Sequence, residues 1–131
     1  MSGGQFALII VGLVGIAESM WGISSPDKLK KAVEQVVREA PPRNMGMALF
    51  FAMLTAVFWV LMVPDRPISG WALLFMSWIF SGGAFVNLKS GGFQQMVEFL
   101  ILRRSTGAIR TIYSAELLAC GGMIGIALAG V

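Results

Sequence analysis

The sequence has no histidine, a single cysteine and few charged residues, and each shortage excludes a class of function. Without histidine, the common zinc, haem and non-haem iron sites lose their main ligand. Cys120 alone cannot form an intramolecular disulfide. The serines have no convincing base beside them, so no nucleophile–base set can be assembled. The sequence therefore predicts that the protein is not an enzyme and holds no cofactor and no metal.

Charged residues make up 13% of the chain, against about 25% in soluble domains. In their place stand four long apolar runs, each close to the ~20 residues that cross ~30 Å of hydrocarbon. Because backbone groups in lipid must be satisfied internally, the runs should be helices. The sequence therefore predicts an all-α integral membrane protein of one domain, residues 1–131. Its four transmembrane helices are expected at Phe6–Ile23, Gly46–Val63, Ser69–Leu88 and Ile112–Val131.

The charges that remain are placed unevenly along the chain. Nine of the ten basic residues lie in two long connections, 24–45 and 89–111, beside the apolar runs. The positive-inside rule then predicts that both connections face the cytoplasm, with the termini and the short turn 64–68 outside. This distribution also argues against nucleic acid as a partner. Residues 1–5 carry no basic side chain, so we expect the first run to be retained rather than cleaved as a signal peptide.

Each long connection contains a segment with helical spacing of apolar residues. The first begins at Pro26 and stops at Pro41-Pro42, and the second covers about residues 93–100. We expect two amphipathic interfacial helices that turn cations toward lipid headgroups. A helix packed against the protein's own spans is the alternative, and the pattern leaves both open. The cations concerned are Lys28, Lys30, Lys31, Arg103 and Arg104.

The order span, amphipathic helix, span occurs twice, at about 6–63 and 69–131. Arg43, Ala48 and Ala52 in the first half correspond to Arg110, Ala115 and Ala119 in the second. Two spans in each half predict two parallel hairpin repeats, related by an axis along the membrane normal.

Two carboxylates lie inside the apolar runs, Glu18 and Glu116. An ionised carboxylate at the centre of a bilayer costs ~2.5–3.5 kcal/mol or more, so such residues are functional candidates by default. Trp21 and Tyr113 mark the expected cytoplasmic boundary, and Glu18 and Glu116 each lie about one turn from one of them, at similar depth. Both carboxylates are within reach of Arg43 and Arg110 as ion-pair partners. They are either snorkelling or paired structural carboxylates, or a proton- or cation-binding pair.

Small residues recur at helical spacing along the spans. Such ridges let helix backbones approach closely, which is how packing drives helix association in lipid. The pattern indicates helix contact but does not separate contact within the chain from contact with a partner. The residues are Gly15, Ser19, Ala48, Ala52, Ala56, Ala115, Ala119, Gly121, Gly125 and Ala129.

The first half resembles the small YjeT-like inner-membrane family at five places: Gly12-Leu13, Glu18, Pro26, Arg43 and Gly46. The resemblance covers about residues 7–62. It implies a hairpin fold and a bacterial inner membrane, and the family brings no activity with it. The second half departs from the pattern, with Ser81 or Gly82 in place of the glutamate and Tyr113 in place of the glycine.

Three functions remain open from the residues alone. The leading hypothesis is a small non-catalytic accessory or scaffold subunit of a larger membrane complex, with other membrane subunits or further copies of itself as partners. The second is a proton- or cation-coupled transporter or channel that uses Glu18 and Glu116. The third is a lipid-interacting surface protein.

Overall fold

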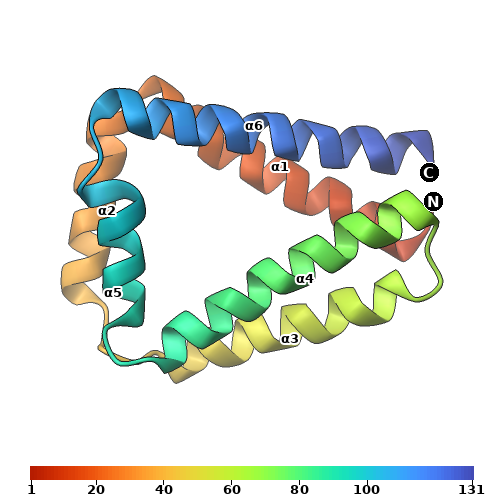
Figure 1. Cartoon of the computed structure of the whole chain (residues 1–131), viewed down its shortest axis with the longest axis horizontal. Coiled ribbons are helices and arrows are strands. Elements are labelled where there is room, and N and C mark those ends of the chain that lie inside the picture. Colours follow the sequence, from red (N-terminus) through yellow and green to blue (C-terminus); the bar gives the residue numbers. More distant parts are fainter.

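The computed structural model describes residues 1–131 and contains helices only (Figure 1). Four helices are long and apolar enough to cross a membrane: α1 (Gly3–Ser24), α3 (Met45–Met62), α4 (Pro67–Leu88) and α6 (Thr106–Ala129). Between them lie α2 (Pro26–Glu39), α5 (Gly92–Val97) and a short π-helix, η1 (Glu98–Leu102). The prediction of an all-helical, membrane-embedded protein with four membrane-length helices is therefore confirmed.

The ends of the helices follow from local sequence. Ser2 and Gln5 form a capping box at the start of α1, with hydrogen bonds of 3.0 and 2.7 Å. The expected start of the fourth span at Ile112 was wrong, because α6 begins six residues earlier, at Thr106. The Ser105 hydroxyl accepts a hydrogen bond from the Ala108 backbone N–H at 3.2 Å, which extends the helix through its polar first turns.

The membrane-length helices pack in two pairs, α1 with α6 and α3 with α4. Figure 1 shows that the two pairs meet near the chain termini and separate toward α2 and α5, so that the molecule is a wedge. The main hydrophobic core lies where all four spans come together. It consists of Leu8, Phe58, Leu73, Met76 and Ala127.

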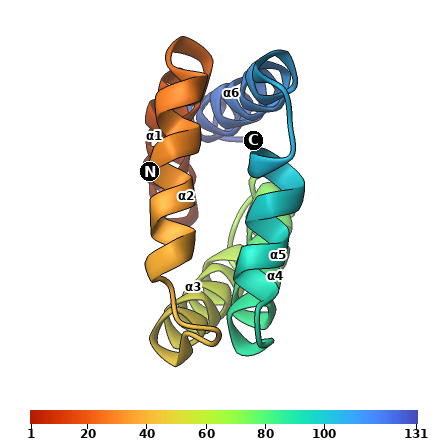
Figure 2. The ribbon, with the colours of Figure 1, turned by 90° about the vertical axis from the view of Figure 1, so that its left-hand side faces the viewer.

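The two halves of the chain form two layers that face each other. Figure 2 shows α1, α2 and α3 on one side and α4, α5 and α6 on the other. Contacts between the layers join α1 to α6, α2 to α5 and α3 to α4. This order of elements agrees with a repeat about an axis through the wedge, although an ancestral duplication stays a prediction.

The hairpins expected within each half need correction, because the spans of one half are not side by side. Helix α2 has 14 residues and is therefore about 21 Å long. It runs across the open end of the wedge and holds the adjoining ends of α1 and α3 apart (Figure 1). By contrast, only Val63–Arg66 separate α3 from α4, and these two helices pack along their length.

The two ends of the wedge differ in what they carry. Both long connections lie at the open end, whereas the termini and the α3–α4 turn lie at the other (Figure 1). There the Ile68 backbone N–H donates to the Val131 carbonyl at 3.0 Å, and the Ser2 hydroxyl donates to Asp65 Oδ2 at 3.1 Å. The connections are therefore at one end of the molecule, and the compartment that each end faces stays a prediction.

Helix α2 turns its apolar side toward the spans. Leu29 is buried in a small cluster with Ile109 and Tyr113 of α6. Lys28 and Lys31 are exposed on its other faces. The apolar side of α2 at Leu29 therefore packs against the protein's own spans, which was one of the two alternatives for this helix. Contact of the lysines with lipid headgroups stays a prediction.

Candidate functional site

The site is built on a seam of small residues where α1 packs against α6. A Cβ on Gly12 would collide with Ile124, one on Gly15 with the Cys120 Sγ, and one on Gly22 with the Tyr113 ring. Ser19 on the same face is fully buried, and its hydroxyl donates to the Gly15 carbonyl at 2.6 Å. Because these side chains are small or absent, the two helix backbones come close and bring the side chains of α6 against α1.

This close approach places Glu18 and Glu116 together. The Glu116 Oε1 lies 3.8 Å from the position that a Cβ on Gly15 would take, one turn from Glu18. Both carboxyl groups line the same cavity. Glu18 is exposed and Glu116 is half-buried, so both remain open to the space beside the helices.

The space beside the carboxyls is a cavity of about 450 Å³ under the bridging helices. Glu18 and Trp21 line it from α1, and Ile112, Tyr113 and Glu116 line it from α6. The remaining walls come from α2, α5 and η1 and are apolar throughout: Leu29, Ala32, Val33, Val36, Phe93, Met96, Val97, Leu100 and Ile101. The only carboxyl groups in the cavity are therefore those of Glu18 and Glu116.

Tyr113 lines the same cavity, and its hydroxyl group has no hydrogen-bond partner within the chain. Its side chain is only 4% exposed, and the hydroxyl forms no hydrogen bond with the rest of the chain. The buried polar atoms without a partner are the Ser69 Oγ and the Gln94 Oε1, and the Tyr113 oxygen is not among them. The tyrosine hydroxyl is therefore open to the cavity, where a donor or acceptor from outside the chain can reach it.

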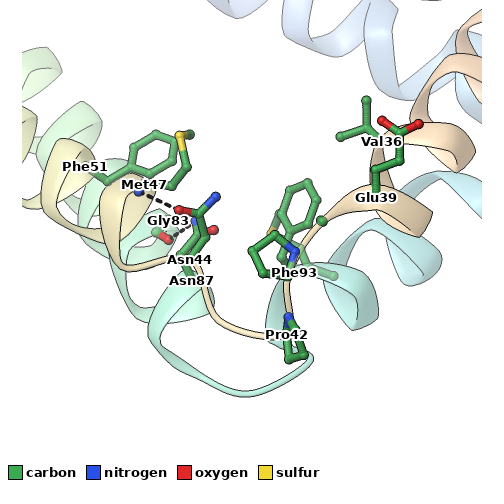
Figure 3. Close-up of a pocket in the computed structure, with 12 residues that line it drawn as sticks. Val36, Glu39, Pro42, Asn44, Met47, Phe51, Gly83, Asn87 and Phe93 are labelled. Atoms are coloured by element: carbon green, nitrogen blue, oxygen red, sulfur yellow. Dashed lines mark hydrogen bonds between the residues drawn. The ribbon is translucent and has the colours of Figure 1, made fainter.

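A second cavity of about 440 Å³ lies at the other end of the bridging helices, against α3 and α4 (Figure 3). Val36, Phe93 and Met96 line both cavities. Its polar groups are already engaged: the Asn87 Nδ2 donates to the Gly83 carbonyl at 2.8 Å, and the Asn44 Oδ1 accepts from the Met47 backbone N–H at 3.0 Å. The two amides of the second cavity are therefore engaged within the chain, whereas the first cavity holds the free Tyr113 hydroxyl and the carboxyls of Glu18 and Glu116.

The expected ion pairs with Arg43 and Arg110 do not form. The two ion pairs of the chain are Arg38–Glu34 at 2.7 Å and Arg103–Glu98 at 3.5 Å. The Arg110 Nε instead donates to the Ile23 carbonyl at 3.2 Å, close to the negative end of the α1 dipole. Arg43 is exposed in the connection that leads into α3. Neither intramembrane carboxylate has a cationic partner within the chain.

The predicted small-residue ridges divide into two groups. Gly15, Ser19 and Ala48 are buried inside the chain. The others are exposed in this single chain: Ala52, Ala56, Ala115, Ala119, Gly121, Gly125 and Ala129.

The basic residues are also not equivalent. Lys28, Lys31 and Arg103 are exposed, whereas the Lys30 Nζ donates to the Arg104 carbonyl at 3.1 Å. The Arg104 guanidinium lies 4.8 Å from the centre of the Phe99 ring, in cation–π contact. Arg103 also pairs with Glu98, so three of the five predicted headgroup contacts already interact within the chain.

The sequence reasoning missed the parts of the site that depend on tertiary packing. Tyr113 and Trp21 were interpreted only as markers of the membrane boundary, and Gly12 and Gly22 were not assigned to packing. A signal for the glycines was present, since residues 12, 15, 19 and 22 follow helical spacing and are all small. No local pattern indicated that Tyr113 stands beside Glu18, because the two are on different helices.

Comparison with protein-family models, with curated proteins and with solved structures gives no match for this chain.

Proposed function

We propose that the protein is a small, non-catalytic accessory or scaffold subunit of a larger complex in a bacterial inner membrane. In this role it holds other membrane-spanning segments against faces of its own helices that the chain leaves uncovered. The YjeT-like motifs of its first half are consistent with that membrane. The proposal depends on helix packing. Few side chains are buried within the chain, and its helices leave faces of small residues uncovered that another helix could contact.

The observation that carries the proposal is the ridge on α6. A Cβ placed on Gly121 or Gly125 would meet no atom within 4 Å, and Ala129 beyond them is exposed. The α1 helix packs on another face of α6, which includes Tyr113 and Cys120. Lipid tails are as apolar as a helix surface, so close backbone contact is what favours association in a bilayer. The ridge thus supports the docking of a further helix.

The wedge shape gives independent support. The two helix pairs separate toward the bridging helices (Figure 1). The two cavities at this end are lined by apolar side chains from α1, α2, α3, α5, η1 and α6. In a bilayer, lipid or another protein segment must fill this space. A subunit that holds its two helix pairs apart offers a partner the inner face of each pair, in addition to the small-residue ridge on the outside of α6.

The test is purification in mild detergent, followed by native mass measurement of the intact assembly. We expect the wild type to be recovered with a second component or as an oligomer. The double variant Gly121→Leu/Gly125→Leu should lose it, because two leucines would hold the next helix away. Gly82→Leu/Gly107→Leu is the matched control, since neither added Cβ would meet an atom within 4 Å. Recovery of the wild type as a lone monomer would contradict the proposal.

A second function, proton- or cation-coupled transport, is favoured by the position of Glu18 and Glu116 in one cavity beside the α1–α6 seam. We place it second because the polar residues deeper in the spans are elsewhere. The Thr55 hydroxyl donates to the Phe51 carbonyl at 2.9 Å, within the α3–α4 pair. Flux in liposomes should disappear in Glu18→Gln and Glu116→Gln, and a wild type without flux for any tested ion would remove this function.

A further inference from the structure

We propose that the cavity beneath α2 and α5 is a binding site for an organic ammonium ion with a large apolar body. The ammonium group would lie between Glu18 and Glu116, and the apolar body would lie along the walls formed by the bridging helices. This site is separate from the α6 ridge, so it goes beyond the assembly role and does not depend on it.

Charge is the first reason for this choice of ligand. Glu18 and Glu116 line one cavity without a cation from the chain, because Arg110 is bound to the Ile23 carbonyl and the two ion pairs of the chain are elsewhere. Two carboxylates that face one cavity are stabilised by a positive charge between them. A ligand cation supplies that charge, whereas an anionic lipid headgroup would be repelled.

Tyr113 is the second and independent reason. Its side chain is 4% exposed and lines the cavity, and its hydroxyl has no hydrogen-bond partner. A hydroxyl oxygen accepts a hydrogen bond from an N–H donor. An ammonium that carries N–H groups therefore satisfies the two carboxyls and the tyrosine together, which a quaternary cation cannot do.

The walls exclude a simple metal ion and favour an apolar body. No group of three or more metal-ligating side chains exists in the structure, and the rest of the cavity offers hydrocarbon rather than oxygen ligands. The volume, about 450 Å³, falls in the usual range for small organic ligands, roughly 300–1,000 Å³. Trp21, Tyr113 and Phe93 add aromatic surface that attracts cations and packs against rings.

The probe is 1-naphthylmethylammonium, with two analogues of the same ring system. One is the trimethylated ammonium, which keeps the charge but has no N–H, and the other is 1-naphthylacetate, which inverts the charge. Binding is measured on wild-type protein in nanodiscs of zwitterionic lipid, with partition into empty nanodiscs subtracted. We expect saturable binding of both cations and none of the anion. Equal binding of the anion, or no saturable binding of either cation, would overturn the proposal.

Variants then assign the binding to residues. Glu18→Gln and Glu116→Gln should each weaken binding of both cations by about tenfold, because each removes one of the two negative charges that face the ammonium group. Glu34→Gln and Glu98→Gln are matched controls outside the cavity and should leave the affinity unchanged. Tyr113→Phe should weaken the N–H probe several-fold and leave the trimethylated probe unaffected. Unchanged affinity in both cavity variants would contradict the assignment.

A measurement on the wild type guards against variants that fail to fold. A hydrophobic carbodiimide labels carboxyl groups in the membrane, and mass spectrometry locates the label. The ammonium probe should protect Glu18 and Glu116 from labelling, while naphthylacetate should not. The double variant Gly121→Leu/Gly125→Leu should lose assembly through the α6 ridge but keep this protection. The experiments therefore test the assembly role and the ligand site independently. Labelling that the ammonium probe does not reduce would count against the site.

Discussion

The ring of Tyr113 in α6 packs so closely on Gly22 in α1 that a Cβ at residue 22 would overlap it. This contact joins two features of the molecule. It belongs to the small-residue seam that pairs α1 with α6, and it fixes the tyrosine in the wall of the carboxyl cavity. The width of the seam and the shape of the cavity are therefore set by the same residue pair.

Gly22→Ala should destabilise the protein, because the added methyl group must displace the Tyr113 ring. Overpacking of this kind costs ~1–3 kcal/mol. Gly82→Ala is the matched control, since its Cβ would meet no atom within 4 Å, and alanine favours a helix over glycine by up to ~1 kcal/mol. Unfolding by SDS, followed by circular dichroism in bicelles, compares the two. Equal stability of both variants would contradict the packing described for Gly22.

Gly15→Cys should form a disulfide with Cys120, the only cysteine of the natural chain. The Cβ positions would be 3.5 Å apart, within the range of disulfides, ~3.5–4.5 Å, once the Cys120 Sγ rotates away. After mild oxidation and proteolysis between the two halves, fragments that contain residues 15 and 120 should stay joined on a non-reducing gel. Gly82→Cys should give no intramolecular link. Free fragments in the Gly15→Cys variant would mean that α1 does not pair with α6.

The extents of the spans could be predicted because apolar content and length depend on neighbouring residues. Three predicted spans agree with α1, α3 and α4 to within three residues at each end. The start of α6 was missed because Thr106 and Arg110 are polar, and hydropathy does not register a cap such as Ser105. Residue type alone therefore located the apolar part of each helix better than its polar ends.

The pairing of the spans could not be predicted in the same way. Residues near in sequence suggested that α1 and α3 form a hairpin, but the rigid length of α2 separates them. The depth of Glu18 and Glu116 could be inferred from Trp21 and Tyr113, whereas their meeting depends on Gly15 and on the choice of α6 as the partner of α1. Which helices pack together depends on the whole chain, so short sequence motifs do not predict it.

Both bridging segments should be reached from the same side of the membrane. In a Cys120→Ala background, Lys28→Cys and Arg103→Cys should react with an impermeant maleimide from one side, because α2 and the end of η1 share the open end of the wedge. Pro64→Cys, in the turn at the opposite end, should react only from the other side. The comparison uses sealed vesicles of both orientations. Labelling of residues 28 and 103 from opposite sides would contradict the layered fold.

The exposed cations of the open end should recruit anionic lipid. A cation close to an anionic surface contributes about 1 kcal/mol, equivalent to about fivefold in lipid affinity. Lys28→Gln/Lys31→Gln/Arg103→Gln should therefore lower the number of anionic lipids that remain bound in native mass spectra. High salt should weaken the wild type's preference, since the Debye length falls from ~10 Å at 0.1 M to ~3 Å at 1 M.

The control for this experiment is Glu34→Gln/Arg38→Gln, which removes the exposed ion pair at 2.7 Å and leaves the net charge unchanged. It should retain as much anionic lipid as the wild type, because recruitment depends on the net positive charge of the open end, which this variant does not change. Lys30 is left in place in the triple variant, because its ammonium holds the Arg104 carbonyl at 3.1 Å and its loss would disturb the contact between α2 and the end of η1. If the triple variant and the wild type retain neutral and anionic lipids equally, the basic residues of the bridging helices serve the fold and not the membrane surface.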